Sequence, residues 1–279
     1  MSGRLVVCPT PIGNLEDVTL RVLSSLREAD VVACEDTRRT RVLLDRYGVS
    51  ARLVSYHEHN EERRAAELVE RMREGQVVAL VSDAGMPLVS DPGYVLVRAC
   101  VGAGLPVEVL PGPSAAVTAL VASGLPGDEW RFAGFLPRKK AELRTVLAQP
   151  GGTLVAFESP RRLPGTLALL ASLDPSREVA VCRELTKAHE EVVRGSAGEL
   201  AERYAGKPPK GEVALVLGPL EASAAAGTGD AALAALRRLV EAGAKPRKAA
   251  AVVAELTGAS ANALYRGLTS TPQQDRDDP

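Results

Sequence analysis

Apolar runs and amphipathic stretches alternate along the first half of the chain, and this alternation predicts a sheet covered by helices. Short β-branched runs predict strands, whereas apolar residues at every third or fourth position predict helices. The predicted strands are residues 5–8, 31–34, 53–56, 77–81 and 107–110. The predicted helices are residues 19–28, 37–47, 60–74, 93–101 and 114–123. Because strands and helices take turns, we expect a mostly parallel sheet with helices on both faces.

A second set of strands and helices follows the turn at residues 124–128. Its predicted strands are residues 132–135, 153–157, 179–182, 191–194 and 213–217, and its predicted helices are residues 140–148 and 163–173. The strands after residue 178 are closely spaced, which predicts antiparallel pairing. The fold class is therefore α/β, with a parallel-sheet N-terminal domain and a mixed-sheet second domain.

The pattern also predicts where the chain divides. We place the first α/β domain at residues 1–118 and the second at residues 119–220. Residues 221–228 are rich in Ala, Ser and Gly and are expected to form a linker. Three short helical patterns predict a small helical domain over residues 229–268, followed by a disordered polar tail at 269–279.

Composition and charge limit the classes of partner. The chain has 279 residues and a formal net charge of −1, so any contact with nucleic acid must come from local basic patches. Such patches occur at residues 38–41, 138–140, 161–162 and 245–248, although solvated helix faces often carry similar clusters. Aromatic residues make up 3% of the chain, which argues against a base-stacking platform.

The cysteines and the apolar runs predict the compartment. The four cysteines lack the spacing of a metal or redox motif and are expected to be small buried residues in a reducing environment. No signal peptide is visible, and no apolar stretch approaches the ~18 residues that cross a bilayer. We therefore predict a cytoplasmic protein without a membrane partner.

Three loops rich in Gly and Pro follow predicted strands, at residues 10–17, 82–93 and 111–115. Gly and Pro fix unusual backbone angles and let a ligand approach the main chain. Because open α/β sheets bind ligands at the carboxyl ends of their strands, these loops form the predicted site. Gly102-Ala103-Gly104 lacks the third glycine of a dinucleotide fingerprint, and no Walker A motif occurs. These absences argue against nicotinamide and ATP cofactors.

Four segments carry a family resemblance. They are Thr10-Pro11-Ile12-Gly13-Asn14-Leu15, Cys34-Glu35-Asp36-Thr37-Arg38, Ser82-Asp83-Ala84-Gly85-Met86-Pro87 and Pro111-Gly112-Pro113-Ser114-Ala115. Together they resemble the tetrapyrrole methylase superfamily and, more narrowly, its ribosomal RNA small subunit methyltransferase I family. The resemblance runs from about residue 4 to residue 219, and more loosely to residue 267. It implies a two-domain methylase fold with a small C-terminal helical extension, and a homodimer.

The resemblance also implies a reaction. A methyl group would pass from S-adenosylmethionine to the ribose 2′-hydroxyl of a cytidine in 16S ribosomal RNA, with the RNA or the 30S subunit as partner. One alternative is a C-methyltransferase of tetrapyrrole precursors on the same fold, which absorbance changes of a porphyrinoid substrate would reveal. Another is a non-catalytic RNA-binding assembly factor, which would bind the cofactor without transferring its methyl group.

S-adenosylmethionine carries a positive sulfonium, an adenosine and a zwitterionic amino-acid end, and it has no phosphate. Backbone carbonyls suit the sulfonium, backbone N–H groups suit the carboxylate, and an Asp can accept from the ammonium. The loop around Asp83 and Gly85 has this character, although an ordinary turn has a similar sequence. The resemblance places the cofactor between the two domains and implies contacts with Pro11, Gly13, Ser82, Asp83, Ala84, Gly85, Met86, Leu88, Ser114, Ala115, Leu185 and Ala214.

Methyl transfer to a hydroxyl requires a near-linear approach of oxygen, methyl carbon and sulfur, so positioning supplies most of the effect. A ribose hydroxyl is a poor nucleophile, and a general base or a nearby cation helps it. The catalytic candidates are Glu35, Glu158, Glu184 and Lys187, with Asp36 and His57 or His59 as further possible bases, and the residues alone do not select among them. His57 and His59 alternate at a predicted strand end, yet only His189 remains as a further histidine, so no metal site is expected.

Overall fold

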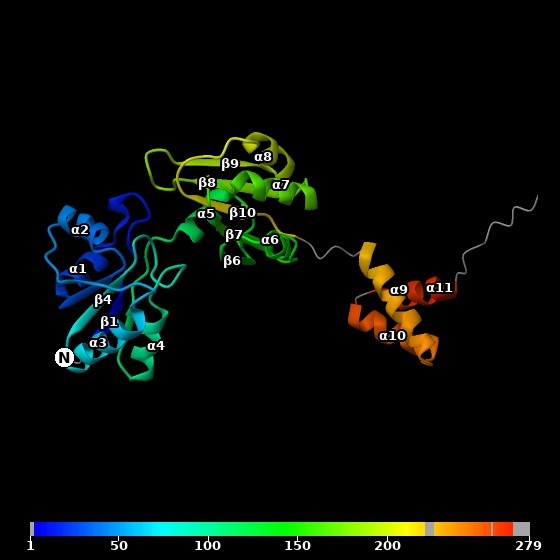
Figure 1. The fold of residues 1–279 in the computed structure, drawn as a ribbon, viewed down its shortest axis with the longest axis horizontal. Helices are drawn as coiled ribbons and strands as arrows, with labels where there is room; N and C mark the ends of the chain where they lie inside the picture. The colour runs from blue at the N-terminus through cyan, green and yellow to red at the C-terminus, as the bar shows by residue number, and fades with distance from the viewer. Residues whose placement is uncertain (1–2, 221–225, 258, 270–279) are drawn as a thin grey trace, which may run out of the picture. The chain divides into compact units, whose positions relative to one another are not determined.

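The computed structural model describes residues 3–220, 226–257 and 259–269, and the chain forms two compact units (Figure 1). Unit 1 comprises Met1–Leu220 and contains two β-sheets. Unit 2 comprises Glu221–Pro279 and is helical in its described part. Within the described ranges, no helix combines the length and the apolar character that crossing a membrane requires.

The first sheet of unit 1 has five parallel strands in the order β3-β2-β4-β1-β5. The strands are β1 Arg4–Val7, β2 Val31–Cys34, β3 Leu53–Ser55, β4 Val77–Val81 and β5 Val107–Val109. The helices between them are α1 Leu20–Glu28, α2 Thr37–Arg46, α3 Glu61–Arg73 and α4 Tyr94–Gly102, with a short 3-10 turn, Leu15–Asp17, before α1. The predicted parallel sheet is confirmed.

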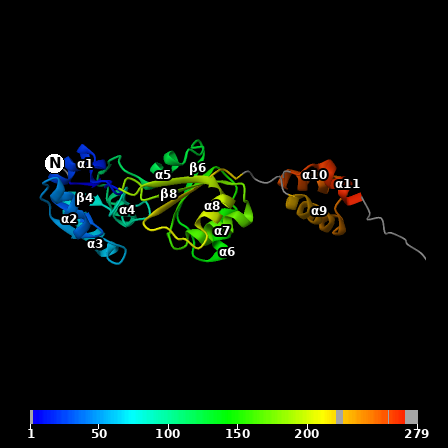
Figure 2. The same ribbon diagram turned by 90° about the horizontal axis from the view of Figure 1, so that it is seen from above.

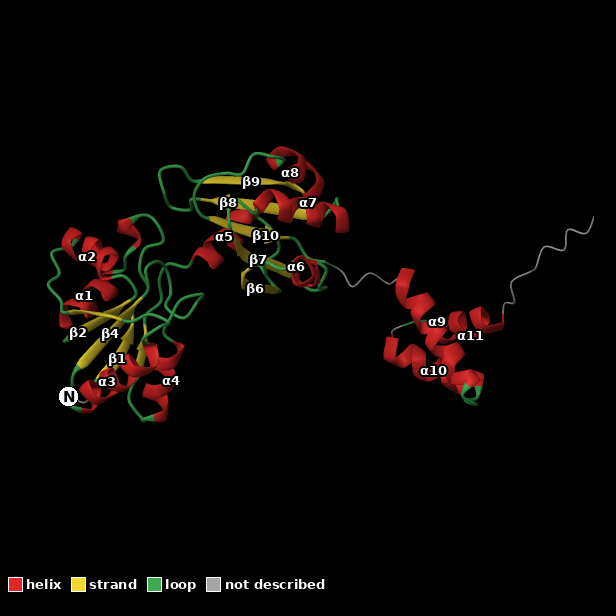
Figure 3. Ribbon diagram, in the orientation of Figure 1, coloured by secondary structure: helices red, strands yellow, loops and turns green. Residues whose placement is uncertain are grey.

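Helices cover both faces of this sheet (Figure 3). Leu5 and Val7 pack in a core with α3 and α4, whereas Val6 and Cys8 pack in a core with α1 and α2. The alternation follows from the pleat of the strand, which points successive side chains to opposite faces. A strand that is buried on both faces needs apolar residues at every position, which is the pattern seen in the sequence.

The second sheet has the strand order β6-β7-β10-β8-β9, in which only β6 and β7 run parallel (Figure 1). The strands are β6 Trp130–Phe135, β7 Thr153–Glu158, β8 Glu178–Arg183, β9 Glu191–Ser196 and β10 Val213–Leu217. The helices are α5 Ala115–Ser123, α6 Lys140–Leu147, α7 Leu163–Leu173 and α8 Ala197–Tyr204. α5 packs on one face, and α6, α7 and α8 pack on the other (Figure 2). The predicted mixed sheet is confirmed.

The division between the two sheets falls before α5. Ala116, Ala119 and Leu120 of this helix are buried with Val155 and Ala180 of the second sheet. A boundary between residues 118 and 119, as predicted, would cut the helix in two. The sequence pattern identifies the helix but does not tell which sheet receives its apolar face.

Unit 2 contains α9 Ala226–Glu241, α10 Pro246–Thr257 and α11 Ala261–Thr269, which share a small core. The three predicted helices are therefore confirmed. α9 begins at Ala226, so the last residues of the predicted linker 221–228 are helical. The rest of that linker, 221–225, and residues 270–279 of the predicted tail lie outside the described residues.

All four cysteines are buried and free. Cys8 and Cys34 belong to the first sheet region, Cys100 lies on α4, and Cys182 lies on β8. Burial, the main cause in each case, raises the pKa of Cys8 to about 12 and that of Cys100 and Cys182 to about 11. These thiols therefore stay protonated and pack as small apolar groups.

Candidate functional site

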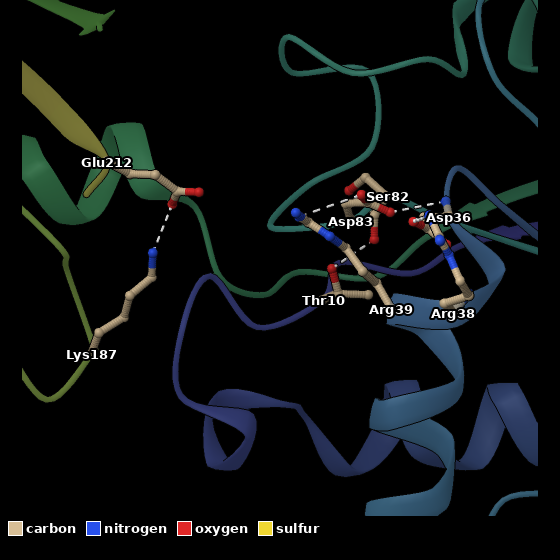
Figure 4. Close-up of polar contacts among 8 residues, drawn as sticks. All are labelled: Thr10, Asp36, Arg38, Arg39, Ser82, Asp83, Lys187 and Glu212. Atoms are coloured by element: carbon tan, nitrogen blue, oxygen red, sulfur yellow. Dashed lines mark hydrogen bonds and ion pairs between the residues drawn. The ribbon is translucent and has the colours of Figure 1, made fainter. Parts of the chain in front are cut away.

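The loop after β1 and the loop after β4 are joined by hydrogen bonds at the carboxyl edge of the first sheet. The N–H of Thr10 donates to the Gly85 carbonyl, and the N–H of Gly85 donates to the Thr10 carbonyl, both at 2.9 Å. The Thr10 hydroxyl donates to the Ser82 carbonyl at 3.0 Å (Figure 4). The Ser82 hydroxyl donates to the Gly85 carbonyl at 3.1 Å. Because these bonds are buried, they hold the two loops together as one rigid side of the site, which we call the loop wall.

The loop after β4 contains strained backbone. Gly85 has a φ of 83°, and the non-glycine residues Leu88 and Ser90 have φ values of 73° and 66°. A left-handed conformation at a non-glycine residue costs on the order of 1–3 kcal/mol, and such residues gather at ligand-binding loops. An added Cβ at Gly85 would lie 3.4 Å from Ile12 Cγ2, so glycine also permits the close approach of the two loops.

A cavity of about 460 Å³ lies between this wall and the second sheet of unit 1. The loops after β1, β2 and β4 and the start of α5 line it from the first half of unit 1. Residues of β6, β7, β8 and β10 and the loops beside them line it from the second half. The volume lies within the usual range for small-molecule and cofactor sites, roughly 300–1,000 Å³.

Three carboxylates, Glu35, Asp83 and Asp91, line one side of the cavity. Asp83 Oδ1 accepts from the N–H of Asp36 at 3.0 Å, and its Oδ2 lies 3.5 Å from Arg39 Nη1 (Figure 4). Burial, and next the charge of Glu35, raise the pKa of Asp91 to about 6. Burial, and next the charge of Asp83, raise the pKa of Glu35. A site with this excess of negative charge favours a cationic ligand.

The remainder of the cavity is largely apolar. Ile12 and Met86 come from the loop wall, and Phe135, Phe157 and Leu185 come from the second half of unit 1. The Phe135 and Phe157 rings meet edge to face with their centroids 5.4 Å apart, and Phe135 remains 67% exposed. An exposed ring beside an apolar floor leaves contact area for a flat aromatic group of a ligand.

Glu184 and Lys187 of the loop after β8 form a polar network with Glu212 of the cavity lining. Lys187 Nζ donates to Glu184 Oε1 at 2.9 Å. It also donates to Glu212 Oε2 at 2.9 Å (Figure 4). A hydrogen bond from the Glu212 N–H and another from Lys187 lower the pKa of Glu184. Burial acts to lower the pKa of Lys187, but the bonds to Glu184 and Glu212 outweigh it and raise that pKa. Both groups are therefore charged, and Glu184 is a weak base.

Gly13 brings the loop after β1 against the loop after β8. A Cβ added at Gly13 would lie 2.6 Å from Lys187 Cγ and 2.7 Å from Thr186 Oγ1. The N–H of Asn14 donates to Thr186 Oγ1 at 3.0 Å. Thr186 has a φ of 66°, so strained backbone occurs on this side of the cavity as well.

The carboxylate of Glu158 is occupied by its neighbours. It is buried, accepts from the Thr166 hydroxyl at 2.6 Å and from the Ser159 N–H at 2.7 Å, and lies 3.4 Å from Arg162 Nη2. These contacts hold the turn between β7 and α7. They favour a positioning role for Glu158, and its catalytic assignment stays a prediction.

The structure brings most of the residues predicted to bind a cofactor into one lining. These are Asp83, Ala84, Gly85, Met86, Ser114, Ala115, Leu185 and Ala214. Pro11, Gly13, Ser82 and Leu88 are outside the lining but belong to the loops that form it. Of the catalytic candidates, Glu35 and Glu158 line the cavity, whereas Glu184 and Lys187 do not.

Asp91, Phe135 and Glu212 also line the cavity and are not predicted from the sequence. Asp91 belongs to the 82–93 loop, and its acidic side chain inside a Gly- and Pro-rich loop is the signal that points to it. Phe135 and Glu212 stand beside strand ends, where sequence pattern does not give the direction of a side chain. Among the described residues, no group of three or more His, Cys, Asp or Glu side chains is arranged to hold a metal ion.

Comparison with known proteins identifies the family. The family model described as Tetrapyrrole (Corrin/Porphyrin) Methylases matches residues 4–201. The chain belongs to the tetrapyrrole methylase family. "Ribosomal RNA small subunit methyltransferase I" of Mesorhizobium japonicum is 48% identical over 270 residues, which cover 95% of this chain and 90% of the relative. The protein of the same name from Escherichia coli O157:H7 is 44% identical over 273 residues, which cover 95% of this chain and 94% of the relative.

Solved structures of the tetrapyrrole methylase family share the fold of unit 1. Uroporphyrin-III-C-methyltransferase from Thermus thermophilus has a TM-score of 0.58 and 27% identity, over 78% of this chain and 94% of that chain. A second structure of such a protein from Thermus thermophilus, complexed with S-adenyl homocysteine, has a TM-score of 0.55 and 24% identity, over 77% of this chain and 97% of that chain. The predicted two-domain methylase fold is confirmed.

Relatives within the family differ in how much of this chain they match. The Thermotoga maritima protein named ribosomal RNA small subunit methyltransferase I is 46% identical over 217 residues, which are 77% of this chain but 98% of the relative. Unit 1 alone has about this size, since it ends at Leu220. Such a relative has little sequence left to correspond to unit 2, so the tetrapyrrole methylase core exists without it.

Proposed function

We propose that this tetrapyrrole methylase transfers a methyl group from S-adenosylmethionine to the ribose 2′-hydroxyl of a cytidine in small-subunit ribosomal RNA. The observation that carries the proposal is the cavity, which is lined by the carboxylates Glu35, Asp83 and Asp91 and by apolar groups from both halves of unit 1. The names of the close relatives supply the substrate class. The proposed partner is the ribosomal RNA or the 30S subunit, and the proposed location is the cytoplasm.

The residues of the cavity fit S-adenosylmethionine. The Asp91 carboxylate offers a counter-charge to the cationic part of the cofactor. The first turn of α5, at Ser114 and Ala115, offers backbone N–H groups to the cofactor's carboxylate. The apolar floor around Phe157 and Leu185 accepts the adenine. When bound, the cofactor supplies a methyl group carried on a sulfonium.

Glu35 is the proposed proton acceptor. It lines the cavity, and its raised pKa makes it a stronger base than an ordinary carboxylate. As the ribose oxygen gains the methyl group, the hydroxyl proton passes to a Glu35 oxygen, and the neutral thioether S-adenosylhomocysteine is left. Lys187 and Glu184 hold Glu212 in place on the opposite side, where it orients the sugar.

Basic side chains beside the cavity are suited to hold RNA phosphates. Arg38 on α2 has a 90% exposed side chain, and its neighbour Arg39 lines the cavity. Lys139 follows β6, whose Phe135 lines the cavity, and Arg161 follows the cavity residue Pro160. With few aromatic residues in the chain, recognition would depend on phosphates, on RNA shape and on the 2′-hydroxyl.

We also propose that unit 1 forms a homodimer through exposed apolar residues of α1, β5 and α5. Leu20, Val109, Val117 and Val121 are exposed on these elements, and Arg21 joins α1 to β5 by a 3.0 Å ion pair with Glu108. Light scattering after size exclusion should give twice the chain mass, and Val121→Glu should give a monomer. A monomeric wild-type protein at micromolar concentration would rule the dimer out.

The first test of function is methylation itself. The purified protein is incubated with labelled S-adenosylmethionine and 30S subunits from a strain that lacks the enzyme, and the labelled nucleotide is mapped by nuclease digestion and mass spectrometry. We expect label on a single cytidine ribose 2′-oxygen. The Glu35→Gln variant is the matched control, because it should bind the cofactor but transfer its methyl group at least 10-fold more slowly.

Two results would contradict the proposal. One is cofactor binding without label on either 30S subunits or free ribosomal RNA, which would favour an assembly factor. The other is an absorbance change of a reduced tetrapyrrole precursor that requires S-adenosylmethionine, which would favour a C-methyltransferase.

A further inference from the structure

Unit 2 carries cations that the cavity chemistry does not use. Lys245, Arg247 and Lys248 surround the start of α10, and all three side chains are exposed. Across the described ranges, no carboxylate forms an ion pair with any of them. Arg266 on α11 is exposed too. We refer to these four residues as the basic face.

The helices that carry the basic face are close together in the sequence and share one core. α10 has 12 residues and α11 has 9, and only residues 258–260 connect them. The two helices pack through Val253 and Leu264, and α9 completes the core. An added Cβ at Gly267 of α11 would lie 3.1 Å from a leucine side chain of α9, so the third helix lies close as well. Two helices with such a short connection, packed on a third helix, are typical of nucleic-acid-binding modules.

Arg247 connects the start of α10 with α11. Its guanidinium carbon lies 5.4 Å from the centroid of the Tyr265 ring. Stacking on an aromatic ring fixes the direction of a guanidinium that would otherwise move freely, and it keeps the positive charge available. The charge of Arg247 is therefore presented beside α11.

We infer that the basic face binds the sugar–phosphate backbone of a helical segment of ribosomal RNA. The inference rests on the proposed function, and it assigns a role to unit 2 beyond the methyl transfer in unit 1. RNA is favoured over a protein partner because three exposed cations, Lys245, Arg247 and Lys248, stand at the start of α10 without an ion pair to any described carboxylate. The major groove of an RNA helix is too deep and narrow for α11 to read bases, so we expect contacts with phosphates and 2′-hydroxyls.

The length of the Thermotoga maritima relative is consistent with methyl transfer in unit 1 and RNA binding in unit 2. A core of unit 1 size accounts for 98% of that relative, so the chemistry does not depend on a counterpart of unit 2. An added unit that carries cations and no cavity residue increases the affinity for a large substrate by giving it a second point of attachment. Loss of the basic face should therefore raise KM for the ribosomal substrate and leave kcat unchanged.

The test uses the full chain with the triple substitution Lys245→Gln, Arg247→Gln and Lys248→Gln. Binding to 30S subunits is measured between about 50 and 200 mM salt, where each lost phosphate contact lowers the slope of log K against log salt by about 0.7–0.9. We expect the slope to fall by about 2–3 and KM for the subunit to rise about 10-fold, with an unchanged Kd for S-adenosylmethionine. The matched control is Arg63→Gln, Arg73→Gln and Lys207→Gln, which removes three exposed charges from unit 1 and should change neither quantity.

Circular dichroism and thermal melting establish that the triple variant is folded. An unchanged salt slope and KM in that folded variant would overturn the inference. So would a loss of binding on Val252→Ser and Leu256→Ser alone, since these exposed apolar residues of α10 would then dock on a protein. Failure of the proposed function is a separate result: wild-type protein would bind RNA with a strong salt dependence but transfer no methyl group.

Discussion

Replacing Asp91 by Asn should raise the Kd for S-adenosylmethionine by about 30-fold or more. Asn has nearly the same shape but removes the charge that we propose to face the cofactor's cation. Removing one member of a partly buried charge pair costs about 2 kcal/mol or more, which corresponds to that change in Kd. Isothermal titration calorimetry at pH 7 measures the effect directly. A Kd within threefold of wild type would show that Asp91 does not face the cation.

The same substitution should not destabilise the fold. The pKa of Asp91 is raised to about 6 in the folded protein, whereas an unfolded Asp titrates near 3.8. Between these values the unfolded state has lost its proton and the folded state retains it, so wild-type stability falls as pH rises from about 4 to about 6. Asn carries no such charge. The variant should therefore melt at the wild-type temperature or above at pH 7, which separates a binding defect from misfolding.

Cofactor affinity should also depend on pH through Asp91. A protonated carboxyl cannot pair with a cation, so wild-type affinity should rise as pH increases from 5 to 7 and then level off, with a limiting slope of about tenfold per pH unit. The Asn variant should lack this dependence. Glu35→Gln is the matched control, because Glu35 helps to raise the Asp91 pKa, and its loss should move the midpoint below about 6.

Replacing Gly13 by Ala should lower kcat/KM for the ribosomal substrate by about 10- to 100-fold. The new Cβ would lie 2.6 Å from Lys187 Cγ and 3.0 Å from the Leu185 carbonyl, so the loops after β1 and β8 must move apart. Ile12 and Leu185 line the cavity from these two loops, and a displacement near 1 Å can cost about 100-fold in rate. Steady-state kinetics and the cofactor Kd measure the loss.

Gly102→Ala is the control for the Gly13 prediction. Gly102 lies on α4, and no heavy atom would come within 4 Å of its added Cβ. Alanine is also the better helix former, so this variant should keep full activity and melt at the same or a slightly higher temperature. Wild-type kinetics in the Gly13 variant would mean that the two loops do not need their close contact.

Most of the fold follows from the hydrophobic pattern, because strands of an α/β sheet are continuous apolar runs and their helices are amphipathic. The strands β2 and β4 and the helix α7 have the predicted bounds. α8 is not predicted, since its eight residues are few for a helical period to be recognised. Its signal is local: Ser196 and Glu199 form a capping box at its start. The packing of α5 on the second sheet is a tertiary choice that no local pattern encodes.

The sequence predicts which loops form the candidate site. It predicts less well which side chains of those loops point into the cavity. The loops around Gly85 and Ser114 follow strands, and the carboxyl edge of a parallel sheet brings them together whatever their neighbours are. Glu184 and Lys187 lie on a loop that faces the cavity with Leu185, yet their own side chains turn to Glu212 instead. Asp91 gains its importance from burial beside Glu35, which depends on elements distant in sequence.

The buried cysteines allow local opening of the two sheets to be measured in the wild-type chain, without an added probe. Thiol reagents attack thiolates, so a thiol that is buried and protonated reacts only when the structure around it opens. The rate of modification at Cys182 therefore reports the opening of the second sheet. The rates at Cys8, Cys34 and Cys100 report the opening of the first sheet and its helices. Mass spectrometry of each peptide gives the modification rate of each cysteine with and without bound cofactor. These rates would tell whether a ligand held between the two halves of unit 1 slows the opening of both sheets by the same factor.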